Sequence, residues 1–294
     1  TFSPGAVRAL QAIGADPGDF NGLDFLTPLI NLEGKDHLDY AEGLEDFDSV
    51  AESVWRSRGI NTDAMINKYA TAIIAYQMPN GKFNVNYKDA LKSGDAKWIE
   101  HICSNEMVAF TAQNVKALGP HQDKEYIAKS VETALEYLSS MQLSDGSFPG
   151  MAGQPSGEAT YAVLDMMNTL GISLNDERFV KNGNTVADGL RTFYVEGVGF
   201  INNPETNISV NSISTDELGL GGGISPLRTV SALTYLQAAE NGKFGPDGKG
   251  NSVFEIVGSA LTETPLGAIL LAVIVAALLA LGMVRRYRRI KKEQ

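Results

Sequence analysis

The chain contains the stretch FTAQNVKALGPHQDKEYIAKSVETALEYLSSMQLSDGSF (Phe110–Phe148), and 52 positions later it contains AVLDMMNTLGISLNDERFVKNGNTVADGLRTFYVEGVGF (Ala162–Phe200). The two stretches align without a gap, so that Gly119 falls on Gly171. A fixed period of this size is typical of one supersecondary unit that is used more than once. The repeat therefore predicts a fold that is built from copies of one supersecondary unit.

Apolar residues within each copy follow the period of an α-helix. In the first copy the face consists of Ile127, Val131, Ala134, Leu135, Leu138 and Met141, and around the start of the second it consists of Ala159, Ala162, Val163, Met166 and Leu170. Gly119, Gly171 and Gly14 each follow a helical pattern closely, and glycine after the last helical residue is typical of a left-handed C-cap. The predicted unit is a helix, a glycine stop, a polar loop, a second helix and a turn.

A turn motif of the form Gln-x-x-(Asn/Asp)-Gly-x-Phe occurs twice in the chain. Its three fixed positions are Gln77, Gly81 and Phe83 in the first turn and Gln142, Gly146 and Phe148 in the second. Asn-Gly and Asp-Gly form tight turns because both residues tolerate a positive φ. We expect each Gln to bond backbone groups of the loop and each Phe to fold back onto the helix pair. Taken alone, each turn is equally consistent with one that only closes a hairpin.

The second turn and the residues after it resemble a known family. Gln142–Phe148, followed by Glu158–Ala162 and a helix that ends at Gly171, is similar to the prenyltransferase and squalene-oxidase repeat. Asp176–Val186 resembles the variant found in Gram-positive surface proteins. The resemblance implies an all-α protein, an α/α toroid in which inner and outer rings of helices surround a central cavity.

The resemblance covers most of residues 1–250 and is strongest over residues 107–200. It is thin over residues 30–60 and 84–105. One helix pair per repeat gives about five pairs in residues 1–250. Because the chain begins with Thr, we expect a further helix to precede it and to complete the ring.

Residues 265–284 form a run of twenty uncharged, mainly apolar residues. A helix of that length matches the hydrocarbon thickness of a bilayer, and a buried core helix rarely needs to be apolar all round. Six basic residues follow directly, namely Arg285, Arg286, Arg288, Arg289, Lys291 and Lys292. Basic flanks stay in the cytoplasm. The sequence thus predicts a single-pass plasma-membrane protein with residues 1–250 outside the cell, a linker at 251–264, a membrane helix at 265–284 and a cytoplasmic tail at 285–294.

The net charge and the single cysteine agree with this placement. Without its last ten residues, which hold six bases and one acid, the chain keeps 18 bases and 34 acids, a net charge near −16. Such an acidic body argues against nucleic acid as a partner. The only cysteine, Cys103, allows no internal disulfide, which suits a Gram-positive surface better than a disulfide-rich eukaryotic one.

The catalytic signatures that the resemblance implies are incomplete in this sequence. The family's cyclases use an Asp-x-Asp-Asp motif, and the nearest match, Glu45-Asp46-Phe47-Asp48, lacks the adjacent pair of acids. It belongs to an acidic stretch, Asp36–Glu52, that we expect to be a solvated loop or helix face. A complement-type thioester would need Cys-Gly-Glu-Gln, but Ser104 follows the cysteine. No catalytic residue is assigned, although an enzyme remains the alternative class.

The sequence predicts neither a metal site nor a bound cofactor. The family's prenyltransferases bind zinc through Asp, Cys and His, and only His101 and Cys103 lie close together in this chain. A His-x-Cys pair on a helix points its side chains apart, so we predict no metal there. His37 and His121 are expected in polar loops. No cofactor is predicted, and a cobalamin-type ligand is implied only by the resemblance to the helical domain of cobalamin carriers.

The stretch Gly219–Gly223 is the richest in glycine, and it lacks the Lys and Ser or Thr of a phosphate-binding loop. We expect a flexible loop at the rim of the toroid, where ligands are often held, so Gly221, Gly222 and Gly223 are the candidate ligand-binding residues. Asp247–Asn251 lacks the glutamate of a calcium loop and is expected to be linker.

These observations favour a membrane-anchored, non-catalytic cell-surface binding protein of the toroid type. Its ligand would be a small molecule, such as a corrinoid, or a surface polymer. In cobalamin carriers a second domain completes the site, so a further extracellular domain or a transporter is an expected partner. The alternative is a terpene-cyclase-like or prenyl-transferring enzyme at the membrane.

Overall fold

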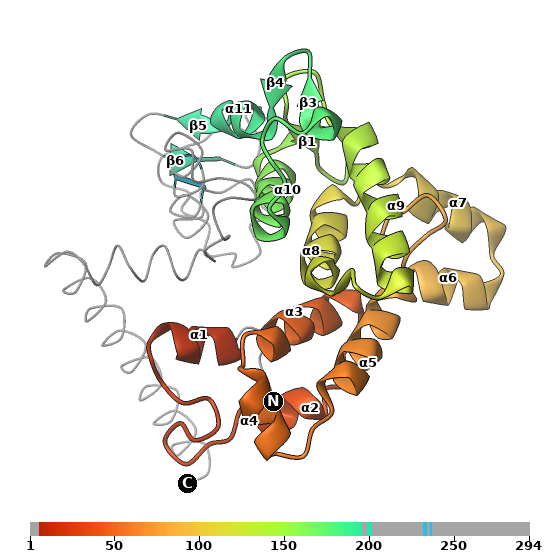
Figure 1. The fold of residues 1–294 in the computed structure, drawn as a ribbon. Helices are drawn as coiled ribbons and strands as arrows, with labels where there is room; N and C mark the ends of the chain where they lie inside the picture. Colours follow the sequence, from red (N-terminus) through yellow and green to blue (C-terminus); the bar gives the residue numbers. More distant parts are fainter. Residues whose placement is uncertain (1–5, 196–198, 202–231, 234–235, 237–294) are drawn as a thin grey trace, which may run out of the picture. The chain divides into compact units, whose positions relative to one another are not determined.

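The computed structural model of the protein describes residues 6–195, 199–201, 232, 233 and 236 (Figure 1). These residues belong to the first of two units into which the chain divides, Thr1–Gly250 and Asn251–Gln294. The described part is mostly helical with a few very short strands, which confirms the all-α class.

The helices are α1 (Ala6–Ala12), α2 (Leu26–Ile30), α3 (His37–Asp48), α4 (Glu52–Ser57), α5 (Thr62–Ile74), α6 (Tyr87–Ser93), α7 (Ala96–Ser104), α8 (Val108–Leu118), α9 (Glu125–Met141), α10 (Gly157–Leu170) and α11 (Val186–Arg191). Two short 3₁₀ helices lie at Gly119–His121 and Glu177–Phe179. Three two-stranded antiparallel hairpins pair β1 (Phe148–Pro149) with β2 (Pro155–Ser156), β3 (Val180–Lys181) with β4 (Asn184–Thr185), and β5 (Tyr194–Val195) with β6 (Gly199–Phe200).

Successive long helices alternate between two layers. Helix α8 packs between α3 and α10, and α1 packs on α3 at the other side, so these four helices form one layer. Helices α3, α8 and α10 each pack against a later helix of the second layer, giving the pairs α3–α5, α8–α9 and α10–α11. The arrangement is that of helical hairpins stacked side by side, as the repeat predicts.

The apolar face predicted for α9 is buried. Ile127, Val131, Ala134 and Leu138 are 0% exposed, and Leu135 is 4% exposed. On α10, Ala159, Val163 and Met166 of the predicted face are buried, but Ala162 and Leu170 are only half-buried, because the buried side of this helix is turned toward Leu164 and Met167. The prediction of an amphipathic helix was therefore correct for both segments, because the 3.6-residue period is set by the side that must be hidden.

The two Gln-x-x-(Asn/Asp)-Gly-x-Phe turns have the same geometry. Gly81 and Gly146 have φ values of 90° and 88°. A Cβ on either would lie 2.1 Å from a backbone oxygen, that of Thr133 for the first turn and that of Thr185 for the second. These two threonines are themselves 52 positions apart, so both turns sit at the same point of the repeat. Glycine is required at both positions because φ is positive and because a Cβ would clash with the backbone of Thr133 or Thr185.

The aromatic and the glutamine of each turn also have the predicted roles. Phe83 and Phe148 are 0% exposed, and their N–H groups donate to the hydroxyls of Thr111 and Thr160 on α8 and α10, at 3.1 and 2.9 Å. The Gln77 amide donates to the carbonyls of Gly81 and Ser130. The Gln142 amide makes the equivalent bonds to the carbonyls of Gly146 and Phe179.

The prediction of a left-handed C-cap at Gly119 was wrong. Gly14 and Gly171 do have positive φ values, 72° and 66°, but Gly119 has φ −57° and continues α8 as a 3₁₀ turn. A Cβ on Gly119 would lie 2.6 Å from side-chain carbons of Leu170. Glycine is needed at position 119 because a side chain there would clash with the end of α10. At the aligned position, Gly171, glycine is needed because the backbone has a positive φ.

The second helix of the repeat is not preserved in the second copy. The 17-residue helix α9 corresponds there to a 3₁₀ turn, the β3–β4 hairpin and the six-residue α11. Asn182 and Gly183, at φ 52° and 83°, form the tip of that hairpin. The prediction of a full second helix was therefore wrong over residues 180–185, although the register of the repeat is kept on both sides.

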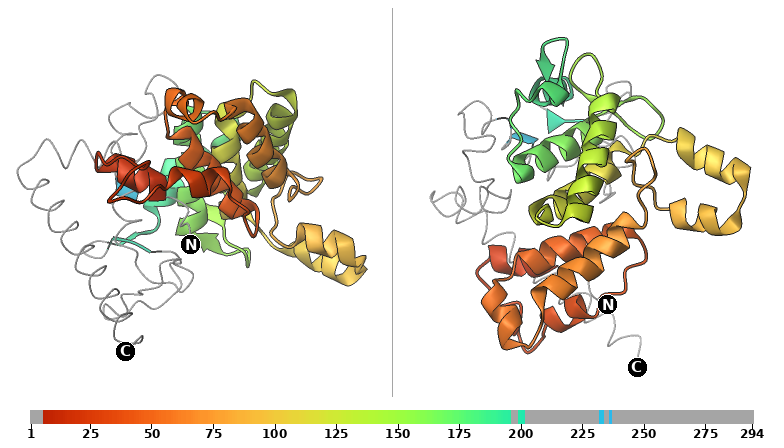
Figure 2. Two further views of the ribbon diagram at one scale, coloured as in Figure 1. Left: turned by 90° about the horizontal axis from the view of Figure 1, so that it is seen from below. Right: turned by 45° about the vertical axis from the view of Figure 1, so that its right-hand side comes forward.

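Residues 84–105, which follow the first turn, form a helical excursion, α6–α7, that has no counterpart after the second turn. Figure 2 shows this pair standing away from the other described helices. It has its own small apolar cluster, formed by Met78, Ala90 and Ile102 with Tyr87, Trp98 and Ile99 packed against them. After the second turn, Gln142–Phe148, the same connection to the next helix is made by the short β1–β2 hairpin.

Candidate functional site

A cavity of about 300 Å³ lies between the first turns of α8 and α10 and the β1–β2 hairpin. Its wall is mainly apolar and includes Met107, Phe110, Pro149, Met151 and Pro155. Glu106 and Glu158 also line it, one just before α8 and the other in the first turn of α10. The size is at the lower end of the range for small-molecule sites.

The start of α8 is held by a buried tyrosine. Met107 lacks a side-chain cap of its own, but its N–H donates to the Tyr137 hydroxyl on α9 at 3.1 Å. The hydroxyl in turn donates to the Glu106 carboxylate at 3.3 Å. Burial raises the pKa of Tyr137, which keeps this phenol a neutral donor. The relay fixes Glu106 at the cavity wall.

The start of α10 is capped by Ser156, whose hydroxyl accepts the Ala159 N–H at 3.2 Å. Phe148 pairs with Ser156 in the β1–β2 hairpin, and the Gly150 N–H donates to the Gln154 carbonyl at 2.8 Å to close its loop. Met151 in this loop is 52% exposed. The hairpin therefore forms an outer wall that both closes the cavity and leaves an apolar side chain at its mouth.

Lys82, between the glycine and the aromatic of the first turn, anchors the excursion. The side chain is 1% exposed, and its ammonium donates to the carbonyls of Ile102, Cys103 and Asn105 at 3.0, 2.8 and 2.8 Å. Burial lowers the pKa of Lys82, partly offset by the charge of Glu106. A cation at the last carbonyls of a helix is favourably placed, so this residue fixes the end of α7.

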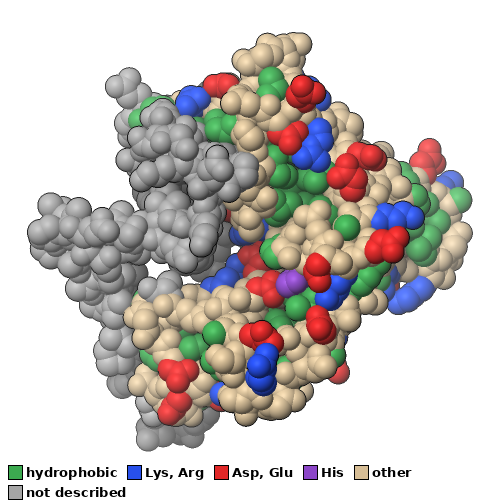
Figure 3. All heavy atoms as spheres, in the orientation of Figure 1, with side chains coloured by type: hydrophobic (Ala, Val, Ile, Leu, Met, Phe, Trp, Pro, Cys, Tyr) green, Lys and Arg blue, Asp and Glu red, His purple; other side chains and the backbone are tan. Residues whose placement is uncertain are grey.

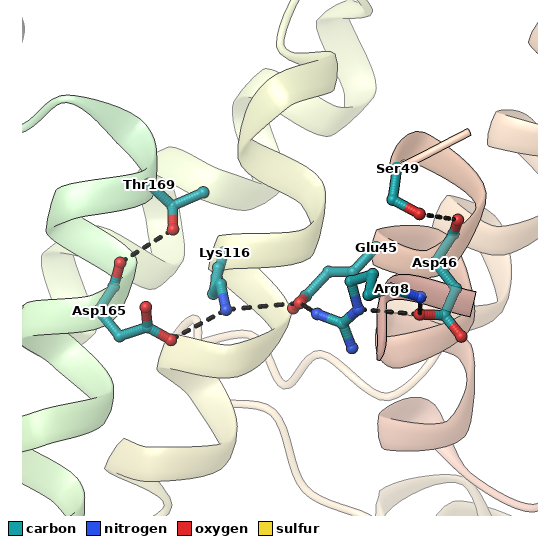
Figure 4. Close-up of polar contacts among 7 residues, drawn as sticks. All are labelled: Arg8, Glu45, Asp46, Ser49, Lys116, Asp165 and Thr169. Carbon is teal, nitrogen blue, oxygen red and sulfur yellow. Dashed lines mark hydrogen bonds and ion pairs between the residues drawn. The ribbon is translucent and has the colours of Figure 1, made fainter. Parts of the chain in front are cut away.

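A row of ion pairs crosses the layer formed by α1, α3, α8 and α10 (Figure 4). Arg8 pairs with Glu45, and its Nε donates to Asp46 at 2.8 Å. Lys116 lies 3.4 Å from the Glu45 carboxylate and 2.9 Å from that of Asp165. Burial disfavours the charge of Lys116, but Asp165 and Glu45 outweigh it and raise its pKa.

The row corrects the expectation that Glu45–Asp48 is a solvated face. Asp46 is 0% exposed, and the Glu45 side chain is 17% exposed. The stretch belongs to α3, where Arg8 from the distant α1 supplies the opposite charge that a buried acid needs. The row joins adjacent helices of one layer, and its acids and bases satisfy each other.

His37 also differs from its prediction as a loop residue. It lies in the first turn of α3, is 0% exposed, and packs against the rings of Tyr76, Phe83 and Phe110. Its Nδ1 lies 2.7 Å from the Asn114 amide nitrogen, which makes Nδ1 the acceptor. Burial lowers the pKa of His37, and the charge of Asp36 opposes this shift.

His121 ends the 3₁₀ turn after α8, and its Nε2 lies 2.7 Å from the Asp48 carboxylate, so it too differs from a simple loop residue. His101 and Cys103 lie on α7 as expected, and both are exposed. Among the described residues no three His, Cys, Asp or Glu side chains are grouped closely enough to hold a metal ion.

Several predicted residues lie outside the described residues. These are the candidate ligand-binding residues Gly221, Gly222 and Gly223, the linker with Asp247–Asn251, the apolar run 265–284, and the basic residues Arg285, Arg286, Arg288 and Arg289. Over the part of the chain that is described, no helix has the length and apolar content needed to cross a bilayer.

Acidic and basic side chains alternate over the face shown in Figure 3. The net negative charge is therefore not gathered into one patch on that face. The cavity is therefore a better candidate for a functional site than this charged face, and no sequence pattern predicted the cavity. Glu106 and Glu158 are 52 positions apart, one repeat, which is the only signal that could have linked them.

A scan against protein-family models, a search of curated proteins and a search of solved structures each found no match.

Proposed function

We propose that the protein is a non-catalytic binding protein whose described helical pairs are part of an α/α toroid. The alternation of successive helices between two layers supports the toroid, since each new pair adds to both rings in turn. The observation that carries the binding role is the cavity between α8 and α10, with its mainly apolar wall and two acids.

The ligand is proposed to be small. A corrinoid, which the family resemblance implies, could place only an edge or one amide side chain in a cavity of about 300 Å³. A small molecule with an apolar body would fill the space. A surface polymer could instead enter by a terminal group.

The binding role is tested by a ligand-observed NMR fragment screen on the full chain in lipid nanodiscs. Wild type is compared with Ala109→Trp, which fills the cavity from α8, and with Ala75→Trp, which places the same ring at an exposed position after α5. Fragments should bind wild type and Ala75→Trp and lose affinity for Ala109→Trp. Equal binding to all three proteins would contradict the proposed site.

We also propose that the helical part lies outside the cell and that residues 265–284 anchor it. Cys103 is the only cysteine and is exposed on α7, so it reports which side of the membrane holds this part. A membrane-impermeant maleimide should label Cys103 in intact cells. Labelling only after lysis would contradict the orientation, and Cys103→Ser is the matched control for background.

A further inference from the structure

The tip of the β1–β2 hairpin, residues 150–154, forms an outer wall of the cavity between α8 and α10. Gly150, Met151, Ala152 and Gln154 of the tip line the cavity, and residues 151–154 are exposed to solvent. A movement of the tip therefore changes the opening of the cavity. The inference drawn from this tip concerns how a ligand enters, and it rests on the proposed binding role.

The base of the hairpin is fixed to α10. Phe148 is 0% exposed, and its N–H donates to the Thr160 hydroxyl at 2.9 Å. Ser156, which pairs with Phe148, accepts the Ala159 N–H and so caps the helix. The base cannot move without breaking the bonds that hold the start of α10.

The tip is one internally bonded piece on two short arms. Its Gly150 N–H donates to the Gln154 carbonyl at 2.8 Å, and its Gly153 N–H donates to the Gly150 carbonyl at 3.0 Å. The arms are Pro149 and Pro155, which face each other in the hairpin. Because proline has no N–H, neither arm donates a hydrogen bond to the other. The tip can therefore swing as a unit while the base stays in place.

A hydrogen bond ties the tip to the start of α8. The Glu106 N–H donates to the Met151 carbonyl at 3.4 Å, which is longer than the usual range of about 2.7–3.2 Å. Over the residues that the structure describes, no other hydrogen bond joins the tip to a residue outside the hairpin. Met151 is 52% exposed, so its side chain contributes little burial that would hold the tip in place.

The partner of this bond on the α8 side is held firmly. The Glu106 carboxylate accepts the Tyr137 hydroxyl at 3.3 Å, and the Met107 N–H donates to the same hydroxyl at 3.1 Å. Tyr137 is 6% exposed on α9. When the bond to Met151 breaks, the tip moves and residue 106 stays, because a segment with few contacts opens locally before the protein unfolds.

We propose that the tip is a flap over the cavity and that the bond from the Glu106 N–H to the Met151 carbonyl is its latch. When the latch breaks, the flap opens and a small molecule enters or leaves. When the latch forms again, the flap closes over the molecule and slows its exit. A single hydrogen bond shifts an equilibrium by about fivefold, so the latch sets the rates of entry and exit without sealing the cavity.

Two substitutions at one position separate the latch from the carboxylate. Glu106→Pro removes the N–H and the carboxylate, and Glu106→Ala removes only the carboxylate, so the difference between the two variants reports the latch. Proline suits the position because the preceding Asn105 has φ −81° and ψ 133°, the extended conformation that a residue before proline adopts. Asn105 keeps its carbonyl bond to Lys82 in both variants. Thermal unfolding checks that both proteins fold.

The first measurement follows a fragment that binds wild type but not Ala109→Trp. Its association and dissociation rates are obtained from NMR line shapes with the full chain in lipid nanodiscs. Both rates should be about fivefold higher in Glu106→Pro than in Glu106→Ala, while the affinities of the two variants stay within about twofold of each other. Equal rates in the two variants would overturn the latch and leave a binding cavity in place.

The second measurement needs no variant. Hydrogen exchange at single-residue resolution compares the Glu106 N–H with the Met107 N–H, which is bonded to buried Tyr137, after correction for their intrinsic rates. In wild type the Glu106 N–H should exchange about tenfold faster, and a bound fragment should slow it. Equal protection of the two N–H groups would show that the flap does not open. Failure of every fragment to bind wild type would contradict the proposed function, and the inference with it.

Discussion

The two copies of the Gln-x-x-(Asn/Asp)-Gly-x-Phe turn share one geometry but lead to different structures. After the first turn the chain makes the α6–α7 excursion before it enters α8. After the second it makes only the β1–β2 hairpin before α10, and the cavity lies beside that hairpin. The comparison shows that the turn determines where the next helix packs. The segment that connects the turn to that helix can differ in structure, and it can form part of a site.

The largest expected effect tests whether both turns are required equally. Gly81→Ala and Gly146→Ala should each lower the free energy of unfolding by about 2–5 kcal/mol, since a strained φ adds to a clash with backbone. Urea denaturation followed by tryptophan fluorescence measures it. Gly94→Ala is the control and should cost about 1 kcal/mol, because Gly94 has φ 65° but a Cβ there would meet nothing within 4 Å.

A large loss for one turn and a small loss for the other would break the equivalence of the two copies. The turns would then be local hairpins that only share a sequence, and the repeat would no longer explain the packing of α8 and α10.

The next effect concerns the residue between glycine and phenylalanine, where the copies differ. Lys82→Met removes the donor for three carbonyls and should cost about 2–3 kcal/mol. Hydrogen exchange should show that α6 and α7 open together while α8 stays protected. Ser147→Ala at the matching position should cost less than about 1 kcal/mol, because the Ser147 hydroxyl donates only to Asp145 nearby. Equal losses would show that Lys82 does not anchor the excursion.

The glutamines allow a finer comparison. Gln77→Leu should destabilise the protein by about 1 kcal/mol more than Gln142→Leu. Both glutamines donate to two carbonyls, but only Gln77 also accepts a hydroxyl, that of Ser130 at 2.6 Å. The Gln142 oxygen has no partner among the described residues. The difference in the free energy of unfolding between the two variants is the quantity to measure, and a difference of opposite sign would contradict it.

The smallest effect belongs to His37, which packs on Phe83 of the first turn. Its pKa is lower in the folded protein than the ordinary value of about 6.5, so the unfolded chain binds the proton more tightly. The contribution of His37 to the free energy of unfolding is fully present above about pH 6.5. It is lost as the pH falls toward the pKa of His37 in the folded protein. The free energy of unfolding should therefore fall more between pH 7 and pH 5 in wild type than in His37→Phe. Identical pH profiles would show that His37 does not titrate with folding.

The sequence could predict what depends on local pattern. The faces of α9 and α10 follow from the helical period, and the turns at Gly81 and Gly146 follow from the residues that tolerate a positive φ. Gly119 was misread because its role is a contact with Leu170, far along the chain.

Long-range partners also explain the other errors. Asp46 looked solvated because its partner Arg8 is 38 positions away, and His37 looked ordinary because Asn114 is 77 positions away. The cavity needs Glu106, Glu158 and the β1–β2 hairpin together, and spacing alone does not show that they share one wall.

The central claim is that the space beside the β1–β2 hairpin, which follows the second Gln-x-x-(Asn/Asp)-Gly-x-Phe turn, is the binding site. Hydrogen exchange of the full chain with and without a fragment that binds wild type but not Ala109→Trp tests it most directly. The account predicts slower exchange over residues 106–110 and 149–159 and no change in α6 and α7. Slower exchange in α6 and α7, with residues 149–159 unaffected, would contradict it.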